Sequence, residues 1–239
     1  MKIVITGPPK TGNMWLKCLL GRIYGLRWLR PHETPERADL AALRPWLAAE
    51  RFPDGTIFHQ HFDYDPETAA SLAAAGATLV TIVRDPYDAF VSTYYTLQQH
   101  AADENRKGRK FTALMGVPLE DPAVIAFLRE GGYRNNLQKG IDWAASGEAV
   151  VLRYEDLSHD PLTELRRATA LISPADDETL EAAVDYCRAD RMRQRTKGGA
   201  KHVRKATVGD SREQLTPAHL AAFREAYADL IERLGYPVR

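Results

Sequence analysis

Residues 7–15, Gly-Pro-Pro-Lys-Thr-Gly-Asn-Met-Trp, have the composition of an anion-binding loop. The loop follows a short apolar run and precedes a helix-like stretch, where backbone N–H groups and a helix dipole can hold a phosphate. Gly7 and Gly12 are five residues apart, which is the glycine spacing of a P-loop, and Lys10 adds a positive charge between them. An ordinary Gly-Pro turn before a helix is the alternative for this segment taken alone.

The residues after the second glycine separate this loop from a Walker A motif. That motif continues with Lys and then with Ser or Thr, whose hydroxyl binds magnesium. Here the two positions are Asn13 and Met14, and the lysine lies inside the loop. The loop therefore predicts a phosphate ligand held without a metal and fits Mg-ATP or Mg-GTP poorly.

A second anion-binding group is predicted where the apolar run 78–83 ends. Arg84 follows that run directly, at the carboxyl end of a predicted strand, where ligands of open α/β sheets bind. Its guanidinium can hold a phosphate through two parallel hydrogen bonds. Ser92 follows about two helical turns later and can add a hydroxyl donor.

Two histidines, His59 and His61, lie in the short apolar stretch 57–62. Residues two apart in a strand share one face, so both imidazoles can point into one pocket. Histidine titrates near neutral pH and can take a proton from a hydroxyl group. A metal pair is an alternative, although no third ligand has suitable spacing, and a structural role stays open for both residues. The other histidines lie in polar surroundings and are expected in solvent.

The elements that must position these groups alternate between strands and helices. Apolar, β-branched runs predict strands, of which 78–83 and 149–154 are expected to be buried on both faces. The predicted strands are 2–6, 56–62, 78–83 and 149–154. The predicted helices are 14–24, 35–50 with a kink or break at Pro45, 66–75, 86–98, 122–130, 133–145, 162–172, 178–185 and 217–234. The polar segments 100–110 and 192–210 predict loops. The pattern indicates an α/β fold with a mainly parallel central sheet flanked by helices.

Composition narrows the class of protein further. The chain has 239 residues and predicts a single domain, 1–239. Lys plus Arg equals Asp plus Glu at 32 each, which argues against a general nucleic-acid binder. No apolar stretch approaches the roughly 18 residues that span a bilayer. Cys18 and Cys187 form no metal or disulfide pattern, so we expect two buried thiols in a cytoplasmic protein.

The loop and the Arg84 segment together resemble a known family. Lys10–Trp15 resembles the PKSGTTW loop that binds the 5'-phosphosulfate in cytosolic-type sulfotransferases, with Asn13 and Met14 departing from the two threonines. The run Arg84–Tyr95, RDPYDAFVSTYY, resembles the family's segment for the donor's 3'-phosphate, R-[ND]-P-x-D-x-x-x-S-x-Y-Y. The chain is identified as a small, bacterial-like member of the family that uses PAPS (3'-phosphoadenosine 5'-phosphosulfate).

Further matches keep the family's order along almost the whole chain. The run 154–157, Tyr-Glu-Asp-Leu, resembles the strand-ending YEDL, and Leu215-Thr216-Pro217 with a final helix resembles the C-terminal end. Arg204 and Lys205 resemble the RKGxxGDW loop that closes over the 3'-phosphate, with Ala206 and Ser211 in place of its Gly and Trp.

The resemblance implies a role for each matched residue. His61 aligns with the family's catalytic base and His59 with a lysine two residues before it. His61, Lys10 and His59 are therefore the expected catalytic residues. The residues expected to bind the donor are Lys10, Thr11, Gly12, Asn13, Met14, Trp15, Arg84, Ser92, Tyr154, Arg204 and Lys205.

The implied reaction moves a sulfuryl group from PAPS to a hydroxyl of a small molecule, a phenol or a sugar, without a metal. The resemblance is weakest in the segments that would shape the acceptor site, so the acceptor is not predicted. Two alternatives stay open: a P-loop nucleotide-dependent kinase, and a catalytically inactive protein that binds PAP or PAPS.

Overall fold

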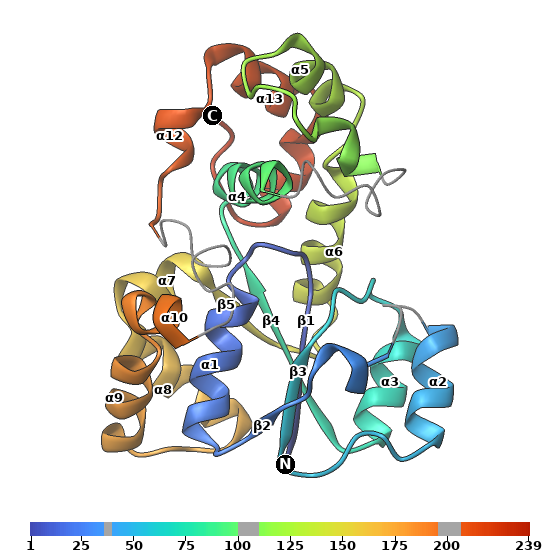
Figure 1. The fold of residues 1–239 in the computed structure, drawn as a ribbon, viewed down its shortest axis with the longest axis vertical. Coiled ribbons are helices and arrows are strands. Elements are labelled where there is room, and N and C mark those ends of the chain that lie inside the picture. The colour runs from blue at the N-terminus through green and yellow to red at the C-terminus, as the bar shows by residue number, and fades with distance from the viewer. Residues whose placement is uncertain (36–39, 100–109, 196–206) are drawn as a thin grey trace.

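A computed structural model of the chain describes residues 1–35, 40–99, 110–195 and 207–239. Its strands form one parallel sheet in the order β2-β3-β1-β4-β5, which confirms the predicted α/β class (Figure 1). The strands are β1 (Lys2–Thr6), β2 (Arg27–Trp28), β3 (Thr56–His59), β4 (Ala77–Val83) and β5 (Val150–Arg153). The central strand β1 therefore has β3 on one side and β4 on the other, and the loop that follows β1 lies between the ends of both.

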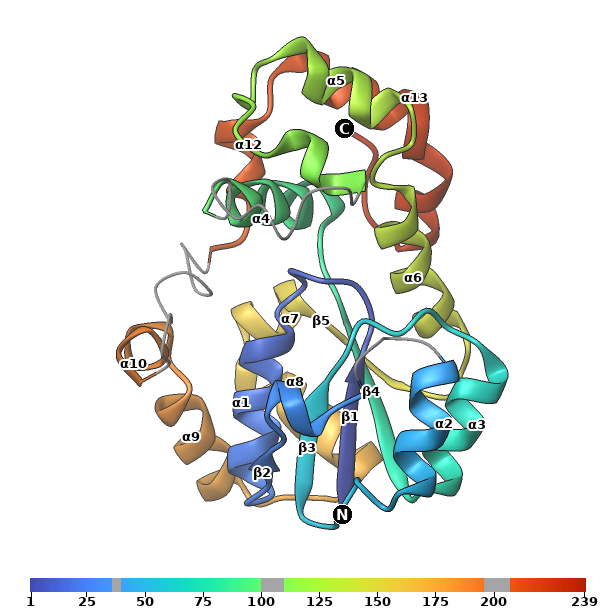
Figure 2. The same cartoon turned by 45° about the vertical axis from the view of Figure 1, so that its right-hand side comes forward.

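Helices cover both faces of this sheet, as Figures 1 and 2 show. One face packs against α1 (Asn13–Ile23), α8 (Pro161–Ile172) and α9 (Asp177–Tyr186), and its core includes Ile57 of β3. The other face packs against α2 (Leu40–Ala48) and α3 (Pro66–Ala74). Burial on both faces explains why the central strands are continuously apolar.

A further group of helices lies beyond the carboxyl ends of the strands (Figures 1 and 2). It consists of α4 (Pro86–Gln98), α5 (Pro122–Arg129), α6 (Arg134–Ala145) and α13 (Pro217–Arg233). Its core is rich in aromatic side chains that meet edge to face or tilted, including Phe90, Tyr133 and Phe223. The edge of the sheet that carries the predicted site is thus enclosed by a second apolar core.

Asp-Pro pairs start several of these helices and explain why their boundaries are readable. In α3, α4, α5 and α8 an aspartate precedes the first-turn proline and its carboxylate accepts a backbone N–H of the first turn. Each such cap typically stabilises a helix by about 1 kcal/mol. At α4 the cap is Asp85, so the same dipeptide that starts the helix also fixes the backbone next to Arg84.

Several short elements differ from the sequence prediction. The strand β2 and the helix α12 (Ser211–Gln214) are too short to give a periodic signal. Tyr154 does not end a strand but begins α7 (Tyr154–His159). The predicted loop 192–210 begins as the last part of α10 (Ala189–Arg195), and residues 196–206 lie outside the described part of the chain. Pro45 lies inside α2, and two short 3-10 helices span Pro31–Glu33 and Lys110–Leu114.

The cysteines correct a further expectation, because Cys18 and Cys187 form a disulfide rather than two thiols. Cys18 lies on α1 and Cys187 caps the end of α9, and these two helices pack against each other. The pairing is invisible in the sequence because 169 positions separate the residues. No described helix is both long and apolar enough to cross a membrane.

One histidine also departs from expectation, because His219 is fully buried. Its Nδ1 accepts hydrogen bonds from the backbone N–H and the hydroxyl of Thr216, and its Nε2–H donates to the Leu119 carbonyl. The imidazole thus completes the start of α13 and ties it to the segment before α5. Burial lowers the pKa of His219 and keeps the ring neutral.

Candidate functional site

The loop between β1 and α1 adopts a backbone that few residues other than glycine tolerate. Gly7 and Gly12 have φ values of 119° and 110°, and Lys10 also has a positive φ of 68°. A Cβ atom on Gly7 would lie 2.7 Å from Oγ1 of Thr81, and one on Gly12 would lie 2.7 Å from the ring of Tyr154. Both glycines are therefore required by left-handed backbone and by close approach.

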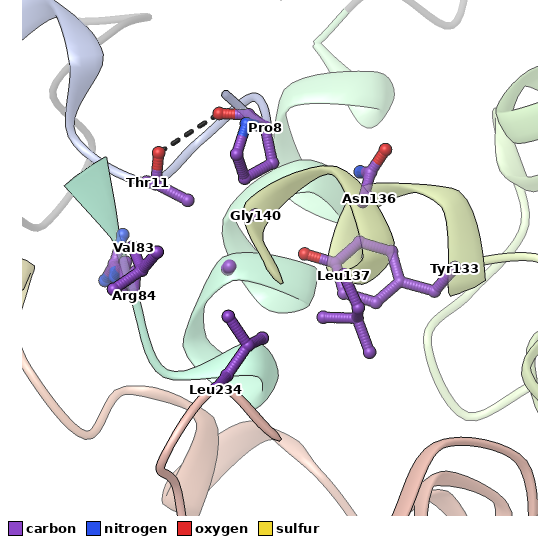
Figure 3. Close-up of a pocket in the computed structure, with 10 residues that line it drawn as sticks. Pro8, Thr11, Val83, Arg84, Tyr133, Asn136, Leu137, Gly140 and Leu234 are labelled. Carbon is purple, nitrogen blue, oxygen red and sulfur yellow. Dashed lines mark hydrogen bonds between the residues drawn. The ribbon is translucent and has the colours of Figure 1, made fainter. Parts of the chain in front are cut away.

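Side chains inside this loop brace it rather than project from it. The Thr11 hydroxyl donates to the Pro8 carbonyl at 3.0 Å (Figure 3). The Asn13 amide donates to the same carbonyl at 2.8 Å. Asn13 also donates to the Thr11 hydroxyl at 3.3 Å. The departure from the threonine pair thus gives the loop an internal hydrogen-bond network, with Asn13 buried.

The start of α1 is built to receive an anion. Its N-cap, Gly12, provides no capping side chain, and the first turn, which includes Met14 and Trp15, contains no acidic residue. Helix N-termini leave up to four backbone N–H groups without an intrahelical partner, and the helix dipole adds partial positive charge there. The N–H groups at this end of α1 can therefore hold a phosphate or sulfate oxygen.

Arg84 connects the loop to two other parts of the site. Its guanidinium donates to the Lys10 carbonyl at 3.3 Å and to the Thr207 carbonyl at 3.1 Å, and it stacks on the ring of Tyr154 at 4.3 Å. Within the described residues, its buried Nε has no hydrogen-bond partner. The side chain is only 10% exposed, so this charge is partly desolvated. It lies beside the loop of residues 7–12, which we call the phosphate loop after its predicted ligand.

Asp88 is a site residue to which the sequence analysis assigned no role. Its buried carboxylate accepts the backbone N–H groups of Gly209 and Ser211 at 2.6 and 2.9 Å and lies 3.8 Å from the Arg84 guanidinium. The carboxylate thus anchors the chain that follows the predicted 3'-phosphate loop. Ser92 lies one helical turn further along α4 on the same side. The only sequence signal was the aspartate within the RDPYD run.

Trp15 and Tyr154 meet on the β5 side of α1. Their rings contact edge to face with centroids 5.8 Å apart. Tyr154 is buried, whereas Trp15 is half-buried. The structure therefore brings Trp15, Tyr154 and Arg84 together as one partly aromatic wall next to the loop. Arg204 and Lys205 lie outside the described residues.

His59 and His61 lie on the opposite side of the loop, at the end of β3. The strand ends at His59, and the two rings are 5.7 Å apart. Nδ1 of His61 lies 2.9 Å from the carbonyl oxygen of Gly7. A carbonyl can only accept, so Nδ1 carries the proton and Nε2 keeps a free lone pair in the neutral ring. The loop after β1 thus fixes the tautomer of His61 and leaves Nε2 able to accept a proton.

The surroundings of His61 favour this neutral form. Burial lowers the pKa of His61, and the positive charges of Lys139 and Lys10 lower it further, against the opposing hydrogen bond to Gly7. Lys139, on α6, donates to the His61 carbonyl at 2.6 Å and pairs with Asp63 at 2.9 Å. The lysine therefore both holds the His61 backbone and disfavours the imidazolium.

A small cleft opens beside the loop, between the end of β4 and α6 (Figure 3). Pro8 and Thr11 line it from the loop, Arg84 from just after β4, and Tyr133 and Asn136 from the start of α6, where Tyr133 is the N-cap. Within the described residues, no group of three His, Cys, Asp or Glu side chains is placed to hold a metal ion.

The family model of the sulfotransferase domain matches residues 1–235. The chain belongs to the sulfotransferase family. This sulfotransferase therefore carries the family's signature over almost its entire length, as the loop and the Arg84 segment predicted.

Solved structures share its fold. Mouse sulfotransferase SULT7A1 complexed with PAP matches with a TM-score of 0.70 and 17% identity, over 97% of this chain and 84% of that one. Retinol dehydratase in complex with androsterone and the inactive cofactor PAP matches with a TM-score of 0.63 and 13% identity, over 100% and 82%. The sulfotransferase domain from the curacin biosynthetic pathway gives a TM-score of 0.51 at 14% identity, over 99% and 98%. None of the curated protein sequences matches this sulfotransferase significantly.

Proposed function

We propose that this sulfotransferase moves a sulfuryl group from PAPS to a hydroxyl group of an acceptor, with His61 as the general base. The observation that carries the proposal is the contact between Nδ1 of His61 and the Gly7 carbonyl. It holds the imidazole of His61 next to the loop whose N–H groups would hold the donor's phosphosulfate. Base and donor site are thus joined by one hydrogen bond.

The residues present fit PAPS on chemical grounds. The uncapped start of α1 offers N–H donors for the 5'-phosphosulfate, and the close approach of Gly7 and Gly12 leaves no room for side chains there. The Arg84 guanidinium, with its orphaned Nε, supports a site for the 3'-phosphate that Ser92, Arg204 and Lys205 would complete. PAPS, when bound, supplies an activated sulfuryl group on a good leaving group. Trp15 and Tyr154 offer aromatic surface for adenine.

Each catalytic residue then has a distinct task. His61 accepts the hydroxyl proton on Nε2, because Nδ1 already donates to Gly7. Lys10, with the N–H groups of the loop, stabilises the negative charge that develops on the bridging oxygen. His59 lies beside His61 and takes the place of the family's lysine next to the sulfuryl group. No step in this scheme calls on a metal ion.

The acceptor we propose is a small molecule or carbohydrate with a hydroxyl group. Retinol dehydratase, a neighbour in fold, has been solved with retinol and with androsterone. We also propose that this sulfotransferase acts in the cytoplasm.

Disulfides are rare in reducing compartments, so the redox state of Cys18 and Cys187 in fresh cell extracts tests the cytoplasmic location.

The activity is tested by incubating the protein with PAPS and pools of phenols, alcohols and sugars, and detecting a gain of one sulfuryl group by mass spectrometry. We expect product that is insensitive to EDTA and lost in His61→Ala. Loss with EDTA and recovery with magnesium would favour a kinase-like enzyme. Tight PAP binding without any product would favour an inactive binding protein.

A further inference from the structure

Lys17, in the second turn of α1, is a buried cation that the proposed mechanism does not use. The residue is only 6% exposed. Within the described residues, its ammonium makes no hydrogen bond and no ion pair, and it lies over the Trp28 ring, 4.5 Å from the ring centroid. Buried lysines are almost always paired. An unpaired one on the helix that begins at the candidate anion-binding loop therefore calls for a ligand.

The position of Lys17 follows from helix and sheet geometry. Gly21 lies one turn further along α1 on the same side, and a Cβ there would lie 2.7 Å from Nε1 of Trp28. Lys17 and Gly21 therefore face Trp28 and the edge strand β2. Trp15, by contrast, faces Tyr154 on the β5 side. Lys17 and Trp15 thus point to opposite sides of the phosphate-loop helix.

The sheet register connects this side of α1 to the histidines. Trp28 pairs with Ile57 in parallel register, and Ile57 belongs to the core under α1. His59, two residues after Ile57, lies on the same face of β3. Lys17 itself lies one turn, about 5–6 Å, along the axis from Asn13 at the start of α1. α1 therefore carries Lys17 on the side of β2 and β3, the strand that leads to the histidines, and not on the side of Arg84 and Tyr154.

The energetics favour an anion at this position. Burial lowers the pKa of Lys17 to about 8, which shows how poorly water and protein compensate its charge. The indole face compensates only part of that loss. A carboxylate, sulfate or phosphate would form a charge-assisted hydrogen bond with the ammonium and restore its full charge.

We propose that Lys17 binds an anionic group of the acceptor, so that this sulfotransferase prefers hydroxyl compounds that also carry a carboxylate or a comparable anion. The inference rests on the proposed function, because it takes the histidine side of the loop as the acceptor side. Lys17 holds the anion while the hydroxyl group of the same molecule faces His61. The residue is thus a specificity-determining residue for the acceptor.

The test uses matched pairs of acceptor candidates that differ in one charge. Each pair is a hydroxylated carboxylic acid and its primary amide, built on an aliphatic chain, a benzene ring and a hexose. Binding to the PAP-saturated protein is measured by calorimetry for the wild type, Lys17→Met and Lys2→Met. Lys2 is the matched control, since its ammonium also lies over an aromatic ring, Phe52, but at the far end of the sheet.

We expect the wild type and Lys2→Met to bind at least one acid about tenfold or more tightly than its amide, the effect of one charge-assisted hydrogen bond. Lys17→Met should bind the two members equally. The preference of the wild type for the acid over its amide should shrink as the pH rises well above 8, because the ammonium of Lys17 then loses its proton. This second measurement needs no variant. Equal binding of every pair by the wild type, or a preference that survives in Lys17→Met, would overturn the inference.

Two further measurements distinguish acceptor binding by Lys17 from a structural role, from donor binding and from the proposed function itself. The melting temperature of unliganded Lys17→Met should equal or exceed that of the wild type, because an uncompensated buried charge is removed. If Lys17→Met weakens PAPS but not PAP, and no acid is preferred, the lysine serves the donor and the inference fails. An acid preference that depends on Lys17 without any sulfated product supports the inference and contradicts the proposed function.

Discussion

Nδ1 of His61 lies 2.9 Å from the carbonyl oxygen of Gly7, the first residue of the phosphate loop. A side chain at the end of β3 is therefore fixed by the backbone of the loop that follows β1. The hydrogen bond orients the imidazole and determines its tautomer. It also means that a shift of the loop would move His61 and the proposed donor site together.

Replacing His61 should abolish transfer but not donor binding. We expect His61→Ala to lower the transfer rate by about 10²–10⁴-fold, the usual contribution of a general base. The dissociation constant of PAP should change little, because we propose that Arg84 and the start of α1, not His61, bind the donor. The effect of His59→Ala, measured in the same assay, should be milder. An inactive His59→Ala with an active His61→Ala would reverse the two roles.

The pH profile of the reaction should reflect the lowered pKa of His61. Burial disfavours the imidazolium, so the neutral base persists below the ordinary histidine pKa of 6.5. The transfer rate should therefore stay high down to pH values below 6.5 and then fall. In Lys139→Met one positive neighbour is lost, which raises the pKa of His61 and moves the acid limb to higher pH. If the acid limb has the same midpoint pH in Lys139→Met as in the wild type, Lys139 does not influence the pKa of His61.

Arg84 should distinguish PAP from AMP. Losing a charge-assisted hydrogen bond costs about 1.5–3 kcal/mol, so the wild type should bind PAP at least tenfold more tightly than AMP. Arg84→Ala should reduce that ratio by about the same factor, as measured by calorimetry. Arg129→Ala is the control, since Arg129 forms an exposed pair with Glu225 on α13. A ratio that Arg84→Ala leaves unchanged would assign the 3'-phosphate to other residues.

The disulfide between Cys18 and Cys187 should stabilise the fold. It closes a loop across 169 positions, and disulfides of this kind contribute about 2–5 kcal/mol, mainly by restricting the unfolded chain. Cys187→Ser should lower the free energy of unfolding in urea by that amount. A reductant should bring the wild type to the level of the variant. Equal stability of the oxidised wild type and the variant would contradict a stabilising role.

The sequence predicted those elements whose signals are local. The run 78–83 is apolar and β-branched, and Asp85-Pro86 marks a helix start, so β4, α4 and the place of Arg84 between them were predictable. The two-residue strand β2 has too few residues for a period. The burial of His219 depends on contacts with Leu119, one hundred positions away, which no local pattern encodes.

The same contrast holds for the site. Glycine spacing and the RDPYD run located the loop and Arg84, because each motif is contiguous. The roles of Asp88, Lys139 and Lys17 depend on which segments pack together. Asp88 on α4 contacts Gly209, and Lys139 on α6 contacts His61, only after folding brings these distant segments together.

Sulfuryl transfer from labelled PAPS is the most direct test of the central claim. The wild type and His61→Ala are incubated with PAPS that carries labelled sulfur and with a pool of hydroxylated acceptors, and labelled product and PAP are quantified together. We predict equal amounts of labelled product and PAP from the wild type, and neither from His61→Ala, although both proteins bind PAP. Binding of PAP by the wild type without labelled product from any acceptor would contradict the proposed activity.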